Sequence, residues 1–118
     1  MNANQETLVL KAYDLIKFTI PTLNRIPRNQ KFVFGDRLQN HLSDLMEMLI
    51  EAHYAPKEQK YPILLRINIQ IEKIRYFFRL GHDLNFYSTG HLGLLAERLD
   101  EIGRRVGGWM KVVPNTPK

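Results

Sequence analysis

The sequence predicts an all-α protein, an antiparallel four-helix bundle with up-down-up-down topology, and three observations indicate this fold class. Apolar residues recur every three or four positions in four separate segments, which is the spacing of one helical face. Prolines and turn-forming residues separate these segments by short connections, and helices joined by short connections pack antiparallel. The length of 118 residues allows one hydrophobic core and no second, so residues 1–118 are expected to form a single domain.

The first helix is expected over residues 6–24. Its apolar face consists of Val9, Ala12, Tyr13, Ile16, Ile20 and Leu23. Pro21 has no amide hydrogen for the carbonyl of Lys17, so the helix should kink or finish in its last turn, near Asn24. Pro27 then restricts Ile26 to extended conformations, which indicates a loop.

The second helix is expected over residues 31–54 and ends before Pro56. Its apolar stripe consists of Phe34, Leu38, Leu42, Leu45, Leu49 and His53. Asp44, Glu47 and Glu51 lie on its outer face, so this helix is the acidic one.

The third helix is expected over residues 62–80, with Pro62 at the first position and Gly81 as the stop. Its main apolar face consists of Ile63, Ile67, Ile71, Ile74 and Phe78, and Leu64, Ile69, Tyr76, Phe77 and Leu80 are expected to widen it. The β-branched content also suits a strand, but the segment is far longer than a strand. Tyr76, Phe77 and Phe78 lie among arginines, and core packing explains them better than base stacking.

The fourth helix is expected over residues 90–113, and Pro114 ends it. Its heptad seam consists of Leu92, Leu95, Leu99, Ile102, Val106, Trp109 and Val113. Gly103, Gly107 and Gly108 lie beside the seam although glycine disfavours a helix. These glycines indicate close contact with another helix, either within the bundle or between subunits.

The composition excludes several classes of protein. Hydrophobic residues make up 44% of the chain and charged residues 25%, which are globular proportions. The absence of cysteine excludes disulfides and thiolate chemistry and suits a reducing cytoplasm. No apolar run is long enough to span a bilayer, so we expect a cytoplasmic protein without a membrane contact.

The charge balance favours polyanionic partners. There are 17 basic and 12 acidic side chains, a net charge of +5. The basic residues form tracks on the third helix (Arg75 and Arg79), on the fourth helix (Arg98 with Arg105, and Arg104 with Lys111) and around the first loop (Arg25, Arg28, Lys31 and Arg37). The alternative is that these are solvated helix faces, with Glu72 and Glu101 as intrahelical partners.

Catalytic and metal-binding patterns are absent from the sequence. None of the four histidines forms an i,i+4 pair, and a site made of His82, Asp83 and His91 is the weakest alternative. Asp100 and Glu101 are sequence neighbours and diverge on a helix. We therefore expect no enzyme, no cofactor and no metal.

Three segments resemble a family of small four-helix bundle proteins. They are Ile26-Pro27-Arg28 leading into Lys31-Phe32-Val33-Phe34-Gly35-Asp36-Arg37-Leu38, then Ile74-Arg75-Tyr76-Phe77-Phe78-Arg79-Leu80, and Glu101-Ile102-Gly103-Arg104-Arg105-Val106-Gly107-Gly108-Trp109-Met110-Lys111. The chain is most similar to the accessory variability determinant of diversity-generating retroelements, over nearly its whole length. A sister branch is encoded by intervening sequences in bacterial 23S ribosomal RNA genes.

The resemblance implies a homopentameric barrel with a basic surface, prokaryotic or phage-encoded, that is not an enzyme. It implies a reverse transcriptase and RNA or DNA as partners in mutagenic copying. Arg75 and Arg79 are the implied contacts, with Arg104 and Lys111 as further ones. Gly103, Gly107 and Trp109 are implied packing or interface positions, and Pro27 and Arg28 are implied to hold the first loop. The sister branch implies instead a structural or ribosome-associated bundle without a polymerase partner.

Overall fold

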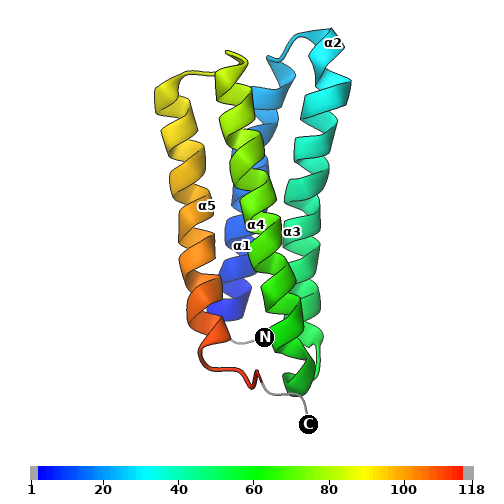
Figure 1. Ribbon diagram of the computed structural model, residues 1–118, viewed down its shortest axis with the longest axis vertical. Helices are drawn as coiled ribbons and strands as arrows, with labels where there is room; N and C mark the ends of the chain where they lie inside the picture. The colour runs from blue at the N-terminus through cyan, green and yellow to red at the C-terminus, as the bar shows by residue number, and fades with distance from the viewer. Residues whose placement is uncertain (1–2, 116–118) are drawn as a thin grey trace.

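Four long helices form an elongated bundle of 49 × 23 × 21 Å in a computed structural model, which describes residues 3–115 and, for side chains, residues 7–115. They are α1 (Ala3–Asn24), α3 (Asp36–Tyr54), α4 (Lys60–Asp83) and α5 (Thr89–Met110). Short elements join them: α2 (Arg28–Gln30), the π-helical turn η1 (Lys31–Gly35) and the 3-10 turn η2 (Lys57–Gln59). Because the connections are short, consecutive helices run antiparallel, and α2 lies at the end of the bundle opposite the termini (Figure 1). The described residues contain no strand, which confirms the all-α prediction.

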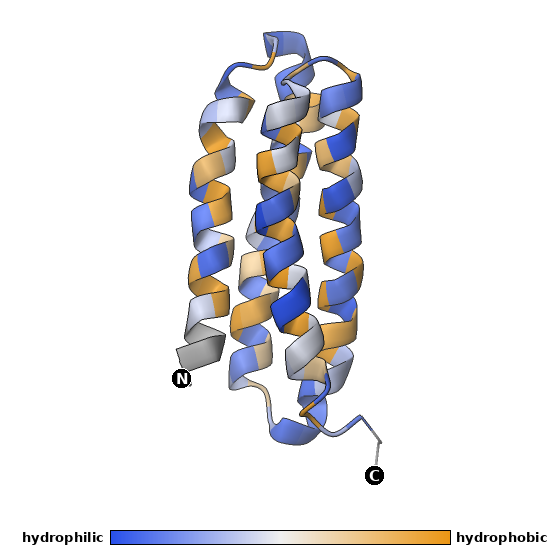
Figure 2. Ribbon diagram, turned by 90° about the vertical axis from the view of Figure 1, so that its left-hand side faces the viewer, coloured by the Kyte–Doolittle hydropathy of each residue, from blue (hydrophilic) through white to orange (hydrophobic). Residues whose placement is uncertain are grey.

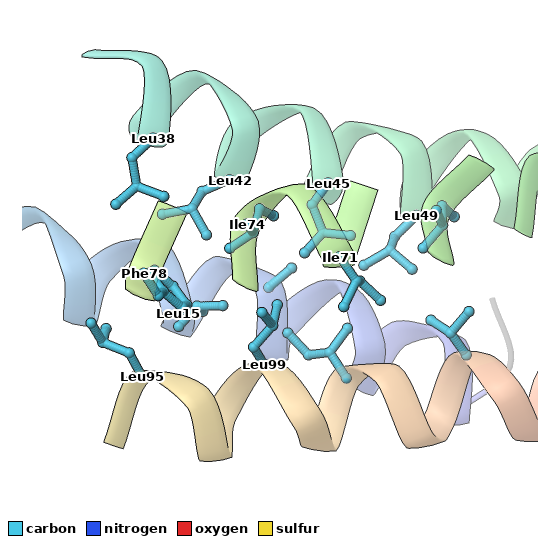
Figure 3. Close-up of a cluster of buried hydrophobic side chains, with 14 of the residues drawn as sticks. Leu15, Leu38, Leu42, Leu45, Leu49, Ile71, Ile74, Phe78, Leu95 and Leu99 are labelled. Atoms are coloured by element: carbon cyan, nitrogen blue, oxygen red, sulfur yellow. The ribbon is translucent and has the colours of Figure 1, made fainter. Parts of the chain in front are cut away.

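The predicted apolar faces of the helices meet along the axis of the bundle. Figure 3 shows Leu38, Leu42, Leu45 and Leu49 of α3 facing side chains of the other three long helices. Four seam residues of α5 are completely buried: Leu95, Leu99, Ile102 and Val106. Polar residues alternate with apolar ones along every ribbon, as expected of helices that each turn one face to the core (Figure 2). Each fully buried apolar side chain contributes roughly 1.5–3 kcal/mol to folding, which makes this core the main source of stability.

The path into α3 differs from a regular α-helix starting at residue 31. Helical structure begins at Arg28, directly after Pro27, and Lys31–Gly35 forms a π-helical turn. The wider turn contains one more residue than an α-helical turn, which changes the direction of the side chains within it. Phe34 and Gly35 are buried, whereas Phe32 and Val33 are exposed.

Helix α4 is longer at both ends than the predicted 62–80. It begins at Lys60, and Pro62 is tolerated because the amides of the first turn have no helical partner. The Lys60 ammonium group donates hydrogen bonds of 2.7 Å to the carbonyls of Ala52 and His53 and so satisfies the end of α3. Gly81 does not stop the helix, which ends at Asp83. Asn85, with φ of 64°, supplies the left-handed residue after it.

Helix α5 begins after Ser88, whose hydroxyl oxygen accepts a hydrogen bond of 3.1 Å from the amide of His91. It ends at Met110, three residues before the predicted end at 113. Two adjacent glycines, Gly107 and Gly108, weaken the last turn, and Pro114 disfavours helical backbone at Val113.

The outer face of α4 is apolar, contrary to the prediction that Ile69, Tyr76 and Leu80 widen the core. At 100° per residue these positions point away from the buried face that includes Ile71 and Ile74. The exposed fractions are 44% for Leu65, 59% for Ile69, 65% for Tyr76 and 44% for Leu80, and we call these four residues the α4 outer stripe. Tyr13 of α1, also assigned to a core face, is likewise exposed.

Candidate nucleic-acid and partner interface

Arg75, the first implied contact, is already bound within the chain. Its guanidinium donates to the carboxylate of Asp100 on α5 and, over 3.0 Å, to Oε1 of Glu72. The hydrogen bond to Asp100, followed by the one to Glu72, raises the pKa of Arg75 although partial burial opposes this. Arg75 therefore joins α4 to α5, and its charge is compensated by two carboxylates.

Three other predicted contacts, Arg79, Arg105 and Arg98, interact with side chains of the same chain. Arg79 is exposed, with Nε 3.8 Å from the carboxylate of Asp83, and an exposed pair of this kind contributes little. Arg105 lies 3.8 Å from Glu101, whose pKa is lowered chiefly by a hydrogen bond from Lys11. Arg98 stacks over the ring of Phe18 at 4.1 Å and so joins α5 to α1.

Arg104 and Lys111 are exposed, and neither side chain has a hydrogen bond or ion pair within the described part of the chain. They lie two turns apart on one side of α5, about 10 Å along the axis. Between them, a Cβ added to Gly107 or Gly108 would meet nothing within 4 Å, so the helix backbone is open there. We call Arg104, Gly107, Gly108 and Lys111 the α5 basic edge.

The glycines do not bring α5 close to another helix of the same chain. Gly107 and Gly108 face open space, and a Cβ at Gly103 would lie 4.0 Å from Ile71, an ordinary contact. Of the two alternatives, close contact within the bundle therefore does not apply to Gly107 and Gly108, because this edge of α5 points away from its neighbours.

Gly103 lines a shallow groove of about 550 Å³ between α4 and α5, together with Asn68, Ile71, Glu72, Arg75, Asp100 and Arg104. Two carboxylates balance two guanidinium groups along this lining. The groove therefore offers no strong charge of either sign to a small ligand.

Trp109, Pro27 and Arg28 act in different ways. Trp109 is half-buried against the core, and the ammonium group of Lys60 lies 5.8 Å from its ring. The carbonyl of Pro27 accepts hydrogen bonds from the amides of Gln30 and Lys31, so Pro27 organises the first loop. The side chain of Arg28 is exposed and makes no hydrogen bond among the described residues, so it does not hold that loop.

A family model described as bAvd-like matches residues 7–113, a span that includes most of α1, all of α3, α4 and α5, and the α5 basic edge. The chain belongs to the bAvd-like family. No curated protein and no solved structure matches it significantly. The assignment thus confirms the resemblance deduced from the loop before α3 and from the third and fourth helices.

The histidines of this bAvd-like protein have separate partners. His82 contacts the hydroxyl of Thr89 at 2.9 Å, whereas His91 contacts that of Thr22 on α1 at 2.7 Å. The described residues hold no group of three or more ligands suited to a metal ion. Within the same residues, no helix is both long and apolar enough to cross a bilayer.

Sequence reasoning missed the α4 outer stripe of this bAvd-like protein and the exposure of Val33 beside Phe32. The stripe follows spacings of four, seven and four, a helical pattern opposite the isoleucine face. That spacing could have found it. The π-helical turn itself has no clear signal in the sequence.

Proposed function

We propose that the protein is a non-enzymatic, cytoplasmic accessory protein of a diversity-generating retroelement. It binds a reverse transcriptase together with RNA or DNA and supports mutagenic reverse transcription. Membership of the bAvd-like family supports this role in general. The observation that carries it is the α5 basic edge, where two exposed cations have no hydrogen bond or ion pair within the described chain.

A phosphodiester backbone suits this edge for two physical reasons. Unpaired cations neutralise phosphates without first giving up an internal ion pair, and the released counterions favour binding. Gly107 and Gly108 have no side chains to keep a strand away from the helix. Arg79 on α4 is exposed and only loosely paired with Asp83, so it remains a separate candidate contact, whereas Arg75 is compensated and belongs to the bundle.

The double variant Arg104→Ala/Lys111→Ala tests this proposal. We expect weaker binding to single-stranded RNA, and the slope of log affinity against log salt should shrink by about 1.4, since each phosphate contributes roughly 0.7. Fluorescence anisotropy across a salt series measures both, and pull-down measures capture of the reverse transcriptase, which should also fall.

The matched control is Lys57→Ala/Arg66→Ala, which removes the same charge from exposed positions of η2 and α4. It should leave the salt slope and the capture unchanged. An equal loss in both double variants would mean that net charge alone matters. Undiminished capture by the Arg104→Ala/Lys111→Ala variant would contradict a polymerase contact at the α5 basic edge.

We further propose that the protein self-associates, with the five-chain barrel that the resemblance implies, and that the α4 outer stripe is a subunit contact. Four large apolar side chains follow one face of α4 over more than four turns without cover from the other helices. A row of large exposed apolar side chains of this kind is typical of an interface between proteins.

The double variant Ile69→Lys/Tyr76→Lys should reduce the molar mass in solution to that of one chain, 13.9 kDa. Light scattering coupled to size exclusion measures it. Leu94→Lys, a change at a similarly exposed leucine on α5, should keep the assembly. A wild-type mass of one chain would rule out self-association.

A further inference from the structure

The π-helical turn η1 presents two apolar side chains to solvent at the end of the bundle where α2 lies (Figure 1). Phe32 is 69% exposed and Val33 is 68% exposed, although both lie next to buried Phe34. A large apolar side chain gains nothing by facing water, so a ring presented in this way suits contact with a ligand.

The base of this turn is anchored in the bundle. Phe34 is buried, and its ring centroid lies 5.8 Å from that of Phe77 and 5.3 Å from that of Phe86. Gly81 of α4 packs so closely against Phe34 that there is no room for a Cβ between them. Phe32 is therefore presented by a preorganised turn, which reduces the conformational entropy lost on binding.

Basic residues lie close to Phe32 in the sequence. Residues 25–37 carry four basic side chains, Arg25, Arg28, Lys31 and Arg37, and one acidic side chain, Asp36, a local charge of +3 out of +5 for the whole chain. Arg28 lies one turn before Phe32, and Arg37 lies one turn after Val33. The side chains of Arg25, Arg28 and Lys31 have no ion pair or hydrogen bond with another described residue.

We propose that Phe32 is a stacking platform for one base of a single-stranded nucleic acid, with Arg28 and Arg37 on the adjacent phosphates. This inference rests on the proposed function. It adds that the bound nucleic acid is single-stranded and that Phe32 contacts one of its bases. An unpaired base offers a free aromatic face, which a base inside a duplex does not. Two apolar side chains form only a small surface for a protein partner. Neighbouring cations that have no ion pair oppose burial unless phosphates neutralise them.

Fluorescence anisotropy with a labelled oligouridine of roughly 16 nucleotides tests the platform. Phe32→Ala should weaken binding roughly tenfold, the effect of losing one base–aromatic stack. Phe32→Tyr should bind like the wild type, whereas Phe32→Leu, which keeps an apolar side chain, should bind like Phe32→Ala. The control Val112→Ala changes an equally exposed apolar residue elsewhere and should have no effect.

Salt dependence separates stacking from charge. Phe32→Ala should keep the wild-type salt slope, and Arg28→Ala should reduce it by roughly 0.7. Affinity for an RNA duplex of the same length should not change in Phe32→Ala. Since Phe32 lies on the surface, circular dichroism should show unchanged folding.

Several results would overturn the platform. Unchanged oligouridine affinity in Phe32→Ala, or an equal loss for the duplex, excludes stacking while leaving the α5 basic edge intact. If Phe32→Ala no longer captures the reverse transcriptase but still binds oligouridine like the wild type, the turn contacts a protein partner instead. Failure of the wild-type protein to bind any nucleic acid would remove both this contact and the nucleic-acid part of the proposed function.

Discussion

Replacing Gly81 with alanine is expected to lower the free energy of unfolding by about 1–3 kcal/mol, as overpacking of a core does. The added Cβ would lie 2.7 Å from Cζ of Tyr87 and 2.8 Å from Cζ of Phe34. Neither ring can withdraw easily. Phe34 packs against Phe77 and Phe86, and the Tyr87 hydroxyl donates a hydrogen bond to the carbonyl of Phe78. Burial raises the pKa of Tyr87, which keeps that hydroxyl protonated as a donor.

Gly107→Ala is the matched control, because it makes the same substitution in a helix where nothing lies within 4 Å of the new Cβ. The free energy of unfolding of this variant should rise by about 0.5–1 kcal/mol, since alanine favours a helix more than glycine does. Urea denaturation of both variants measures the difference. A gain in stability for Gly81→Ala as well would show that Phe34 and Tyr87 leave room at Gly81.

Lowering the pH from about 7 to 5 is expected to destabilise the bundle, because two partly buried histidines must take up protons. Burial is the main cause that lowers the pKa of both His41 and His91. Arg37 and Lys73 add to it at His41, where Asp44 opposes them, and Arg25 adds to it at His91. The unfolded chain, with histidine pKa near 6.5, therefore binds more protons than the folded chain just below that pH.

The stabilising contribution of these histidines is present above the unfolded pKa of 6.5 and is lost as the pH falls below that value and through the lowered pKa of the folded state. Each histidine changes the free energy of unfolding by at most about 1.4 kcal/mol per pH unit. Urea titrations at a series of pH values measure this slope. His41→Gln and His91→Gln should each reduce it, and the double variant should reduce it most. An unchanged slope in the double variant would contradict the assignment. Protonation of Glu101 does not contribute to this slope between pH 7 and 5, because the pKa of Glu101 lies below the usual 4.5.

The fold was largely predictable because helical periodicity is a local property. The positions of Leu95, Leu99, Ile102 and Val106 were enough to find the buried face of α5. The ends of the helices were less predictable, since they depend on contacts with other segments. Gly81 looked like a stop, yet its packing against Phe34 and Tyr87 keeps it inside α4.

The candidate site was likewise predictable in part. The spacing of Arg104 and Lys111 showed that they share one side of a helix. It could not show that neither side chain forms an ion pair in the described chain. Nor could it show that Arg75 is bound to a carboxylate 25 residues further along the chain. The sequence by itself determined the number, order and apolar faces of the helices, because apolar side chains recur along the sequence with the helical period of 3.6 residues. Only the tertiary structure decided which charges are compensated and which apolar side chains stay exposed, because both depend on how each helix is rotated against its neighbours.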